Sequence, residues 1–373
     1  MAKLSEICTI NMGQSPESTT YNENGEGLPF FQGNADFGKI HPNVRVWCNA
    51  PKKIAHKNDI LISVRAPIGA LNVADSDCCI GRGLASLSVN NSVSVAEYIW
   101  YALESKVDYL ISMGTGSTFK AIGKNILFDL DIPLPPLETQ HQIAANLDKV
   151  THTIDICNAI LEKLDLLVKS RFVEMFGEPV KNPMKHPKHT LIEICNKITD
   201  GTHDTPKRYD SGYLLITGKN IRANEIILDQ IEYVNEEDHK TIYARCNPEY
   251  EDILYTNIGV NYGTAVLNTL KYEFSMKNVA LLKPNRTVVN SYYLWKVLNY
   301  MRDYILELNQ VGGAQTFMGL ATIKKISIPV PPLALQEQFA AFVEQTDKSK
   351  LAVKQVLEKA ETLKKALMQE YFG

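Results

Sequence analysis

The stretch Ile132-Pro-Leu-Pro-Pro-Leu137 decides how this chain is organised, because it returns 196 residues later as Ile328-Pro-Val-Pro-Pro-Leu333. Each copy opens a longer repeat, which ends in Phe176-Gly177 in the first case and in Phe372-Gly373 in the second. The separation stays at 196 residues from one end of the repeat to the other, so the two copies align without a gap. An ungapped repeat of this length indicates two copies of one structural unit.

A long helix is predicted in each copy, beginning after the proline pair. Proline is tolerated before or in the first turn of a helix but not in its interior, so the Pro-Pro pairs mark extended entries. In the first copy, apolar residues recur in alternating steps of four and three, which is the heptad pattern of a coiled coil. This first seam consists of Ile143, Leu147, Val150, Ile154, Cys157, Leu161, Leu164 and Val168. The second seam is looser, because Thr346 and Lys350 interrupt a set made of Phe339, Val343, Val353, Val356, Leu357, Ala360, Leu363 and Leu367.

The apolar stripe on such a helix has to be covered. At 1.5 Å per residue each helix could be roughly 50–55 Å long, which is too long for one ordinary domain. The nearest partner of equal length is the other copy, so we expect the two helices to pack on each other. Each follows an equivalent globular segment, which favours an antiparallel pair. The alternative is that each helix packs only on its own domain.

The segments that precede the two helices also resemble each other. Lys3–Thr9 parallels Thr190–Asn196, and Asp59–Arg65 parallels Asp252–Asn257. These short apolar runs break at glycines and polar turns, so they are predicted to be strands and turns. The loops between these segments share little sequence. One scaffold with two different sets of loops favours two recognition sites of the same kind that differ in specificity.

In both halves the spacing of the apolar residues then changes to the period of a helix. Amphipathic helices are predicted over Val95–Ile111 and Tyr292–Leu308, with Trp100 and Trp295 at equivalent points. We expect both tryptophans to lie in the core instead of stacking on bases. Each half is thus an α+β domain followed by a long helix, and the predicted segments are 1–137, 138–177, 178–332 and 333–373.

Composition narrows the class of protein. The 373 residues are 45% hydrophobic and 22% charged, as in a soluble globular protein, and the net charge of −3 argues against binding polyanions over the whole surface. No apolar run is long enough for a membrane span and the N-terminus lacks a signal-peptide core, so a cytoplasmic protein is expected. The seven cysteines are scattered, with no C-x-x-C pair, which favours buried thiols over disulfides or a zinc knuckle.

The sequence contains none of several common catalytic motifs. There is no G-x-x-x-x-G-K-[ST] phosphate loop, no G-x-G-x-x-G after a strand, no G-x-S-x-G elbow and no H-E-x-x-H pair. The eight histidines are isolated, and the closest pair, His186 and His189, lies in a linker rich in lysine and proline. The sequence therefore indicates a protein that recognises a ligand and has no catalytic or metal site of its own.

At this point the chain resembles the specificity subunit of type I restriction-modification systems. The features that carry the resemblance are the two Ile-Pro-x-Pro-Pro-Leu hinges with their following glutamines, the two long helices that end in Phe-Gly, and the Asp-Ile-Leu segments with the glycines after them. The glutamines are Gln140, Gln142, Gln336 and Gln338. The resemblance covers the whole chain, and its layout is more specific than any of its short motifs.

The resemblance implies an α+β fold with two similar α/β target recognition domains, separated by two long conserved helices that pack as an antiparallel coiled coil with pseudo-two-fold symmetry. Each domain would read one half of a bipartite asymmetric DNA site, and the two spacer helices would dock two modification (methyltransferase) subunits. Restriction (translocase and nuclease) subunits would join the complex. S-adenosylmethionine and ATP would belong to those partners, so no cofactor is expected in this chain.

Two other classes stay open. One is the recognition subunit of a related methylation system without a type I restriction translocase. The other is an enzyme whose catalytic site contains none of the motifs named above.

Loop residues next to glycines are the candidates for DNA contact, because Arg reads guanine, Asn and Gln read adenine, and hydroxyl and cationic groups bind phosphate. In the first half they are Gln32, Asn34, Arg65, Arg82, Thr118 and Lys120. In the second half they are Thr202, His203, Lys219, Asn220, Arg222, Asn257, Asn261, Tyr262, Gln315 and Thr316. The expected partner surface consists of Pro135, Pro136, Glu162, Lys163, Pro331, Pro332, Glu358 and Lys359. The alternative is that these residues are solvated loop, turn or helix-surface positions.

Overall fold

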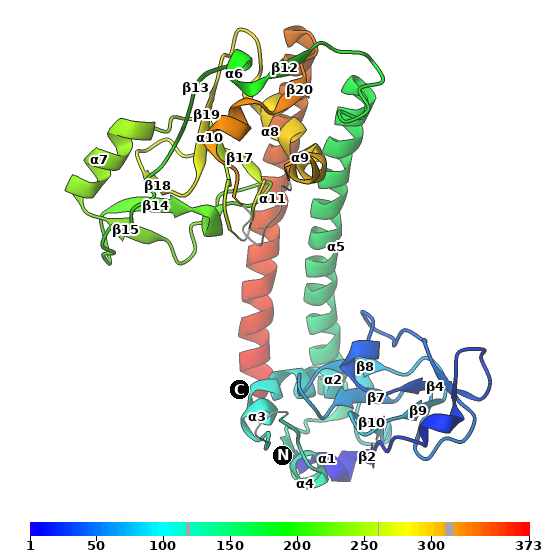
Figure 1. Cartoon of the computed structure of the whole chain (residues 1–373). Coiled ribbons are helices and arrows are strands. Elements are labelled where there is room, and N and C mark those ends of the chain that lie inside the picture. Colours follow the sequence, from blue (N-terminus) through cyan, green and yellow to red (C-terminus); the bar gives the residue numbers. More distant parts are fainter. Residues whose placement is uncertain (117–119, 260, 310–316) are drawn as a thin grey trace. The chain divides into compact units, whose positions relative to one another are not determined.

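The computed structural model describes residues 1–116, 120–259, 261–309 and 317–373. The chain forms two compact units (Figure 1). Unit 1 consists of residues 1–159 and 354–373, and unit 2 consists of residues 160–353. Each unit therefore contains one globular domain together with a part of each long helix.

Unit 1 is built around two small sheets. One has the strand order β2-β10-β7-β8 and is antiparallel, and the other has the order β3-β5-β4-β9-β6. All four residues of β7 (Ile60–Ser63) are buried, as expected for a central strand rich in branched side chains. The other strands are β1 (Ala2–Lys3), β2 (Cys8–Met12), β3 (Tyr21–Asn22), β4 (Leu28–Phe31), β5 (Trp47–Cys48), β6 (Ile54–Ala55), β8 (Leu71–Val73), β9 (Cys78–Ile80), β10 (Leu84–Val89) and β11 (Asp131–Ile132).

Unit 2 repeats this plan. The sheet β13-β19-β16-β17 corresponds to the antiparallel sheet of unit 1, and a three-stranded sheet has the order β15-β14-β18. Its strands are β12 (Lys188–Thr190), β13 (Cys195–Asp200), β14 (Tyr213–Thr217), β15 (Glu232–Val234), β16 (Ile253–Tyr255), β17 (Ala265–Leu267), β18 (Ser275–Lys277), β19 (Ala280–Pro284) and β20 (Ser327–Pro329). The short helices of the two units are α1 (Leu4–Ile7), α4 (Lys124–Phe128), α6 (Leu191–Ile194), α7 (Glu236–Cys246) and α10 (Leu320–Lys324).

The two amphipathic helices predicted over Val95–Ile111 and Tyr292–Leu308 are each interrupted. The first divides into α2 (Ala96–Ser105) and α3 (Val107–Ser112), and the second into α8 (Ser291–Tyr300) and α9 (Arg302–Leu308). The residue at each break, Lys106 or Met301, has ψ near zero (4° and 1°), which turns the helix axis. The prediction of one continuous helix was wrong in both halves, because the apolar period continues through the break.

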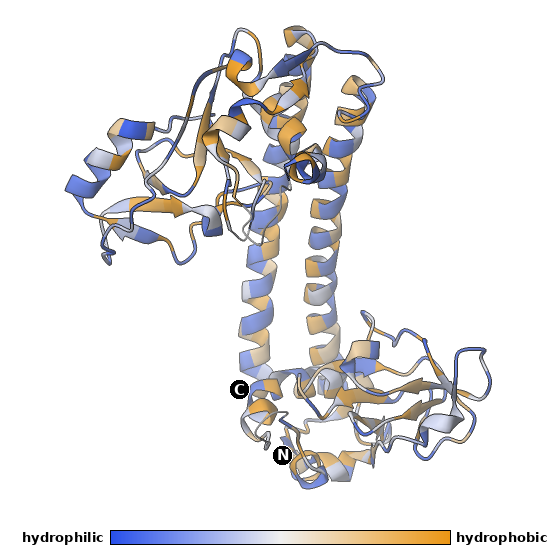
Figure 2. Ribbon diagram, viewed as in Figure 1, coloured by the Kyte–Doolittle hydropathy of each residue, from blue (hydrophilic) through white to orange (hydrophobic). Residues whose placement is uncertain are grey.

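The two spacer helices, α5 (Leu137–Phe176) and α11 (Leu333–Phe372), pack on each other in an antiparallel manner (Figure 1). In unit 1 the first part of α5 shares a core with the end of α11, where Leu147 and Phe372 are buried. In unit 2 the end of α5 shares a core with the first part of α11, where Phe172 and Phe339 are buried. The expected antiparallel pair is confirmed, and Figure 2 shows apolar and polar residues alternating along both helices.

The first seam is buried or half-buried at every predicted position from Ile143 to Val168. The second seam differs from the prediction. Val356 and Leu363 are each 49% exposed, whereas Thr346 is buried and the Lys350 side chain is 13% exposed. When residues are taken at alternating spacings of four and three along α11, Thr346 and Lys350 both fall on the seam. The seam is therefore continuous, but two of its positions are polar.

A buried glutamine fastens each spacer helix to its domain. The Gln140 Oε1 atom accepts hydrogen bonds from Ser94 Oγ and Val95 N, both at 3.0 Å, and its Nε2 donates to Val93 O and Pro135 O at 3.1 and 2.8 Å. Gln336 Oε1 accepts from Asn290 N at 2.8 Å, and its Nε2 donates to Pro331 O at 2.7 Å and to Val288 O at 3.3 Å. The hinge and the start of α2 or α8 are therefore held by one side chain in each unit.

Gly69 and Gly263 occupy equivalent turns with positive φ angles of 87° and 78°. A Cβ atom would lie 3.1 Å from Val107 at the first site and 2.9 Å from Leu306 at the second. These glycines are required by turn geometry and close packing.

All seven cysteines are buried and free of disulfides, as expected from their spacing. Burial raises the pKa of Cys8 and of Cys195 to about 12, so both stay protonated. Among the residues that the structure describes, no helix has the length and apolar character needed to cross a membrane.

Candidate nucleic-acid interface

Four segments of unit 1 that are far apart in sequence lie side by side through backbone hydrogen bonds. The Gly83 amide donates to Gln32 O at 3.1 Å, the Val64 amide donates to Gly83 O at 2.9 Å, and the Ile122 amide donates to Val64 O at 2.9 Å. The side chains that flank these bonds are consequently brought to one edge of the domain.

That edge carries four exposed side chains that were predicted to contact DNA, namely Gln32, Arg65, Arg82 and Lys120. We call this set the unit 1 edge. Arg65 follows Val64, Arg82 precedes Gly83, and the Lys120 carbonyl accepts from the Ala66 amide at 3.1 Å. Three cations and one amide thus converge from four segments. A guanidinium can bind guanine or phosphate and a glutamine amide can bind adenine, so this surface has the groups that DNA recognition needs.

Asn34 lies beside this edge, in a short 3-10 helix (Asn34–Asp36), and is half-buried. The buried Asp36 carboxylate fixes the helix, because it accepts from the Gln32 amide at 2.7 Å and pairs with Arg45. The acidic group is therefore neutralised within the domain and does not oppose a polyanion at the edge.

Unit 2 assembles a corresponding edge. Lys277 pairs with Thr217 across β18 and β14 and forms a parallel bridge with Thr202. The Asn261 amide donates to Gly218 O at 2.9 Å, which adds a further segment to this end of the domain.

Lys219 and Arg222 are exposed at the turn that follows β14. The Arg222 guanidinium donates to the carbonyls of Lys219 and Ile221, both at 3.0 Å, and stays accessible on its other side. We call the set Thr202, Lys219, Arg222, Asn261 and Lys277 the unit 2 edge.

Two further predicted residues are engaged inside unit 2. His203 Nε2 lies 2.8 Å from the buried Asp200 carboxylate, and its Nδ1 lies 3.1 Å from Asn278 Oδ1. Tyr262 packs against the domain core, and its carbonyl accepts from Arg302 at 2.7 Å. The His203 side chain is nevertheless 49% exposed, whereas Tyr262 is half-buried.

Asn220 and Asn257 are buried, with 8% and 1% of their surfaces exposed. Asn220 Oδ1 accepts from the Thr217 amide at 3.0 Å, and its Nδ2 donates to Ile227 O at 3.1 Å, so it closes the turn that presents Lys219. These two asparagines are not on the surface that the prediction required of them, because short polar side chains after strands serve turns as often as ligands. Thr118, Gln315 and Thr316 lie outside the described residues.

Sequence reasoning missed two residues at these edges. Lys277 ends β18 in unit 2, and the exposed Gln14 stands at the equivalent of Thr202 in unit 1, where its amide donates to Ile80 O at 3.0 Å. A signal for Gln14 exists in the sequence, because Gly13-Gln14 and Gly201-Thr202 follow equivalent segments in the two halves. For Lys277 there was none, because a lysine at the end of a strand is common on any solvated surface.

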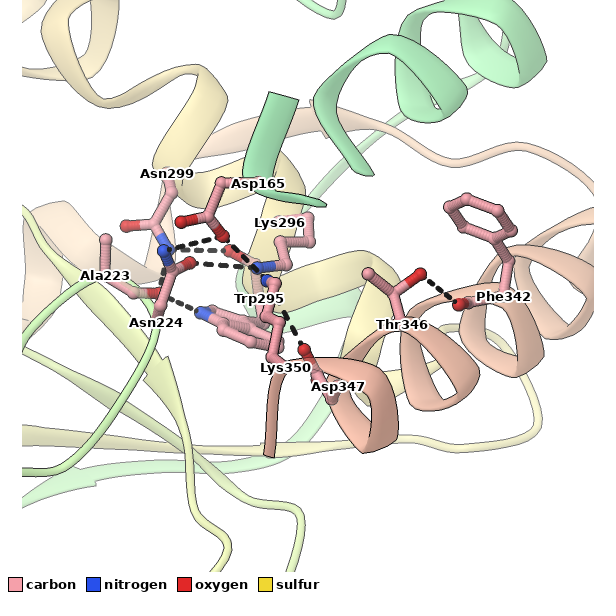
Figure 3. A network of polar contacts seen from close by, with 10 residues as sticks. All are labelled: Asp165, Ala223, Asn224, Trp295, Lys296, Asn299, Phe342, Thr346, Asp347 and Lys350. Atoms are coloured by element: carbon pink, nitrogen blue, oxygen red, sulfur yellow. Dashed lines mark hydrogen bonds and ion pairs between the residues drawn. The ribbon is translucent and has the colours of Figure 1, made fainter. Parts of the chain in front are cut away.

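The turn that carries Arg222 rests on helix α8 of unit 2. Figure 3 shows the indole of Trp295 donating to the Ala223 carbonyl, at 2.7 Å, with the Asn299 amide close to the same oxygen. Trp295 is 3% exposed, so the prediction that it belongs to the core is confirmed, while Trp100 is only half-buried.

A buried lysine links the same turn to both spacer helices (Figure 3). Lys296 Nζ donates to Asn224 Oδ1 at 3.1 Å, Asn224 reaches Asp165 on α5 at 3.3 Å, and Lys350 on α11 pairs with Asp165 at 2.7 Å. Burial, followed by repulsion from Lys350, lowers the pKa of Lys296 to about 8. The turn behind the unit 2 edge is therefore anchored to the domain and to the helices.

The residues predicted to bind a partner are mostly exposed. Pro136, Glu162, Lys163, Pro332, Glu358 and Lys359 are exposed, Pro135 is half-buried and Pro331 is buried. Glu162 and Lys163 lie beside exposed apolar residues that were not predicted to bind a partner. On α5 these are Ile156, Ile160, Leu166, Leu167 and Val173, and on α11 they are Leu351, Val356 and Leu363.

Within the described ranges, no group of three or more His, Cys, Asp or Glu side chains is placed to hold a metal ion.

Comparison with known proteins gives a family. The family model for the type I restriction modification DNA specificity domain matches residues 1–166 and 187–362. The type I restriction enzyme MjaIX specificity subunit of Methanocaldococcus jannaschii is 23% identical over 313 residues, which are 78% of this chain and 71% of that protein. A protein named as the MjaX specificity subunit, from the same organism, is 45% identical over 159 residues. That alignment spans 42% of this chain and 37% of the relative.

One solved structure aligns over the whole chain. It is the S subunit of a type I restriction-modification system from M. genitalium, with a TM-score of 0.67 and 17% identity, covering 100% of this chain and 95% of that one. At this identity the likeness supports the fold of two similar domains and two paired long helices.

Proposed function

Because the chain belongs to the family of type I restriction-modification DNA specificity subunits, which are non-catalytic and recognise DNA sequence, we propose that its two domains each read one half of a bipartite DNA site. The observation that carries this proposal is the presence of the same kind of polar edge in each unit, with different side chains. The unit 1 edge offers Arg65, Arg82, Lys120 and Gln32, and the unit 2 edge offers Lys219, Arg222 and Lys277 among others. Two domains with the same fold but different side chains at the edge suit a DNA site whose two halves differ in sequence.

In this proposal the spacer helices carry two modification subunits, which bring S-adenosylmethionine chemistry to the DNA that this chain selects. Support comes from the exposed apolar residues on the part of α5 that belongs to unit 2, where Ile160 and Leu167 are 38% and 48% exposed. They are seven residues apart, so they share one stripe with Lys163. An exposed apolar stripe on a soluble helix is characteristic of a protein interface. A restriction translocase would complete the assembly, and the alternative is a methylation system that lacks one.

The function is tested by mapping DNA methylation across the genome, by single-molecule sequencing, in cells that carry this gene and its modification gene. We expect one methylated motif with two short half-sites and an unspecified spacer, and its loss when this chain is deleted. Replacing Arg65 and Arg82 together by alanine should relax or abolish one half-site and leave the other unchanged, because each specific contact contributes about 1–3 kcal/mol. Lys149→Ala, an exposed cation on α5, is the matched control.

Two outcomes of the mapping would contradict the proposal. Retention of all methylated motifs after deletion would show that this chain selects no DNA site. A double variant that weakens both half-sites equally would show that unit 1 does not read its half separately.

Docking is tested by replacing Ile160 and Leu167 with glutamate in the full chain. We expect the modification subunit to stop co-eluting with this variant in size-exclusion chromatography, because two carboxylates would have to be buried without partners. Lys169→Glu, an exposed position on the same helix, should co-elute as the wild type does. Unchanged co-elution of the double variant would place the interface elsewhere.

A further inference from the structure

A cavity of about 650 Å³ opens in unit 1 between the domain and the spacer helices. One face of α2 forms its wall, because Glu97, Trp100, Tyr101 and Glu104 follow the spacing of successive helical turns. The remaining polar lining consists of Lys39, Asn58, Asp148, Thr151, Asp155 and Lys364. The cavity is therefore bounded by a tryptophan and a tyrosine and is rich in carboxylates.

Two of the four carboxylates are neutralised locally. Lys39 pairs with Asp155 at 3.0 Å, and Lys364 pairs with Glu104 at 2.8 Å. Over the described part of the chain, neither Glu97 nor Asp148 has an ion pair, although Asp148 accepts a hydrogen bond from the Tyr101 hydroxyl at 2.7 Å. Two negative charges therefore remain uncompensated beside the aromatic wall.

The equivalent face in unit 2 is closed by the chain itself. Trp295, Lys296 and Asn299 stand 195 residues after Trp100, Tyr101 and Glu104. The Ala223–Asn224 turn covers them: its carbonyl accepts from the Trp295 indole at 2.7 Å, and the Lys296 ammonium lies 3.5 Å from the Trp295 ring centroid (Figure 3). A peptide carbonyl and a cation over the indole thus complete this face.

Unit 1 has neither of these groups. Where unit 2 has Lys296, unit 1 has Tyr101, whose hydroxyl is directed to Asp148. Within the residues described, the Trp100 indole makes no hydrogen bond and no lysine or arginine lies over its ring, while Lys39, which also lines the cavity, pairs with Asp155. In the part of the chain that the structure describes, the cavity is bounded by Trp100 and by two carboxylates without an ion pair, and Trp100 lacks the carbonyl and the cation that Trp295 has in unit 2. The Lys364 ammonium in this cavity lies 5.7 Å from the centroid of the Tyr101 ring instead.

We propose that this cavity receives a turn of the modification subunit that presents an arginine or a lysine. The backbone carbonyl of the turn accepts from the Trp100 indole, and the cationic head lies between the Trp100 ring and the carboxylates of Glu97 and Asp148. A cavity of this size holds such a side chain with its peptide groups, and arginine fits best because its planar head stacks on an indole and binds carboxylates. DNA is excluded, because its phosphates would face the carboxylates.

The choice of the modification subunit rests on the proposed function, since α5 and α11 provide Asp148, Thr151, Asp155 and Lys364 to the cavity and are the helices proposed to carry that subunit. The cavity would add a specific cationic anchor to an otherwise apolar docking surface. It also makes docking unequal between the two units, because only unit 1 leaves this face open.

The chemistry of the cavity is tested first with the full chain and a small probe, N-acetyl-arginine-N′-methylamide. The chain has three tryptophans, so an indole ¹⁵N–¹H spectrum contains three signals, and Trp100→Phe assigns one of them. We expect the probe to shift the Trp100 signal in a saturable manner and to leave the Trp295 signal in place. N-acetyl-glutamine-N′-methylamide should bind at least tenfold more weakly, since it lacks the charge.

Docking is tested by the affinity of the modification subunit for the full chain. Glu97→Lys should weaken it about tenfold or more, and Glu97→Gln less, while Glu23→Lys, an exposed carboxylate elsewhere in unit 1, should have no effect. If the wild type does not bind the modification subunit at all, the proposed docking function fails. If it binds but Glu97→Lys equals Glu23→Lys, or the probe shifts no Trp100 signal, the proposed function stands and the cavity assignment is wrong.

Discussion

Phe172→Ala is expected to lower the free energy of unfolding of unit 2 by about 3–5 kcal/mol, the range found when a fully buried phenylalanine is removed from a core. Phe172 is completely buried where α5 meets α11. Its ring lies 5.4 Å from that of Phe339, 4.7 Å from that of Tyr300 and 5.6 Å from that of Tyr293. Truncation therefore leaves a cavity and removes ring contacts to α11 and to α8 at the same time.

Hydrogen exchange measured by mass spectrometry is suited to this test, because peptides from unit 2 report its opening separately from that of unit 1. Peptides of α8 should exchange faster in Phe172→Ala by the factor that the lost free energy implies. The adjacent Val173 is 44% exposed, so Val173→Ala should change the free energy by less than about 0.5 kcal/mol. Equal exchange in the two variants would show that the helix ends are not held together by this aromatic cluster.

Gln140→Leu should destabilise unit 1 by about 3–5 kcal/mol, although leucine is as large as glutamine and more apolar. The substitution leaves the Val95 amide, the Ser94 hydroxyl and two carbonyl groups without their present partner. Each buried group that loses its hydrogen bond costs about 1–3 kcal/mol, and the added apolar burial offsets only a part of that.

Gln142→Leu is the matched control, because Gln142 belongs to the same short motif but is exposed and, within the described ranges, donates to Glu138 alone, at 3.2 Å. Its substitution should cost less than about 0.5 kcal/mol. Thermal and urea unfolding of the full chain, with exchange in α2 peptides as the local measure, separate the two variants. A Gln140→Leu protein as stable as Gln142→Leu would mean that the domain can re-satisfy these groups without the glutamine.

Gln140 and Gln142 differ in burial, and the sequence motif could not predict this difference. The motif indicated that glutamines follow each hinge, but not which of them is buried. A helix places residues two positions apart on different faces, so only one of the pair can turn towards the domain. The packing of α5 against unit 1 decides that it is Gln140.

The polar edges illustrate the same limit for the candidate site. Arg65, Arg82, Lys120 and Gln32 were selected as separate loop residues, and the hydrogen-bond register of four distant segments brings them together. The same criterion selected Asn220 and Asn257, which the fold buries, and passed over Lys277. Polar residues next to a glycine mark a loop, but the sequence does not show which of their side chains face the solvent.

The sequence by itself determined the duplication, the hinges and the long helices, and it favoured their antiparallel pairing, which the structure confirms. These are local or periodic properties: proline ends an extended entry, and a stripe of alternating steps of four and three requires an equally long partner. Tertiary structure alone decided which loop residues share an edge, which glutamine is buried, and why Trp295 is covered while Trp100 borders a cavity. Those outcomes depend on how segments many residues apart align with each other in the fold. A loop that is longer by a few residues can fill a space or leave it empty without changing any periodic pattern in the sequence.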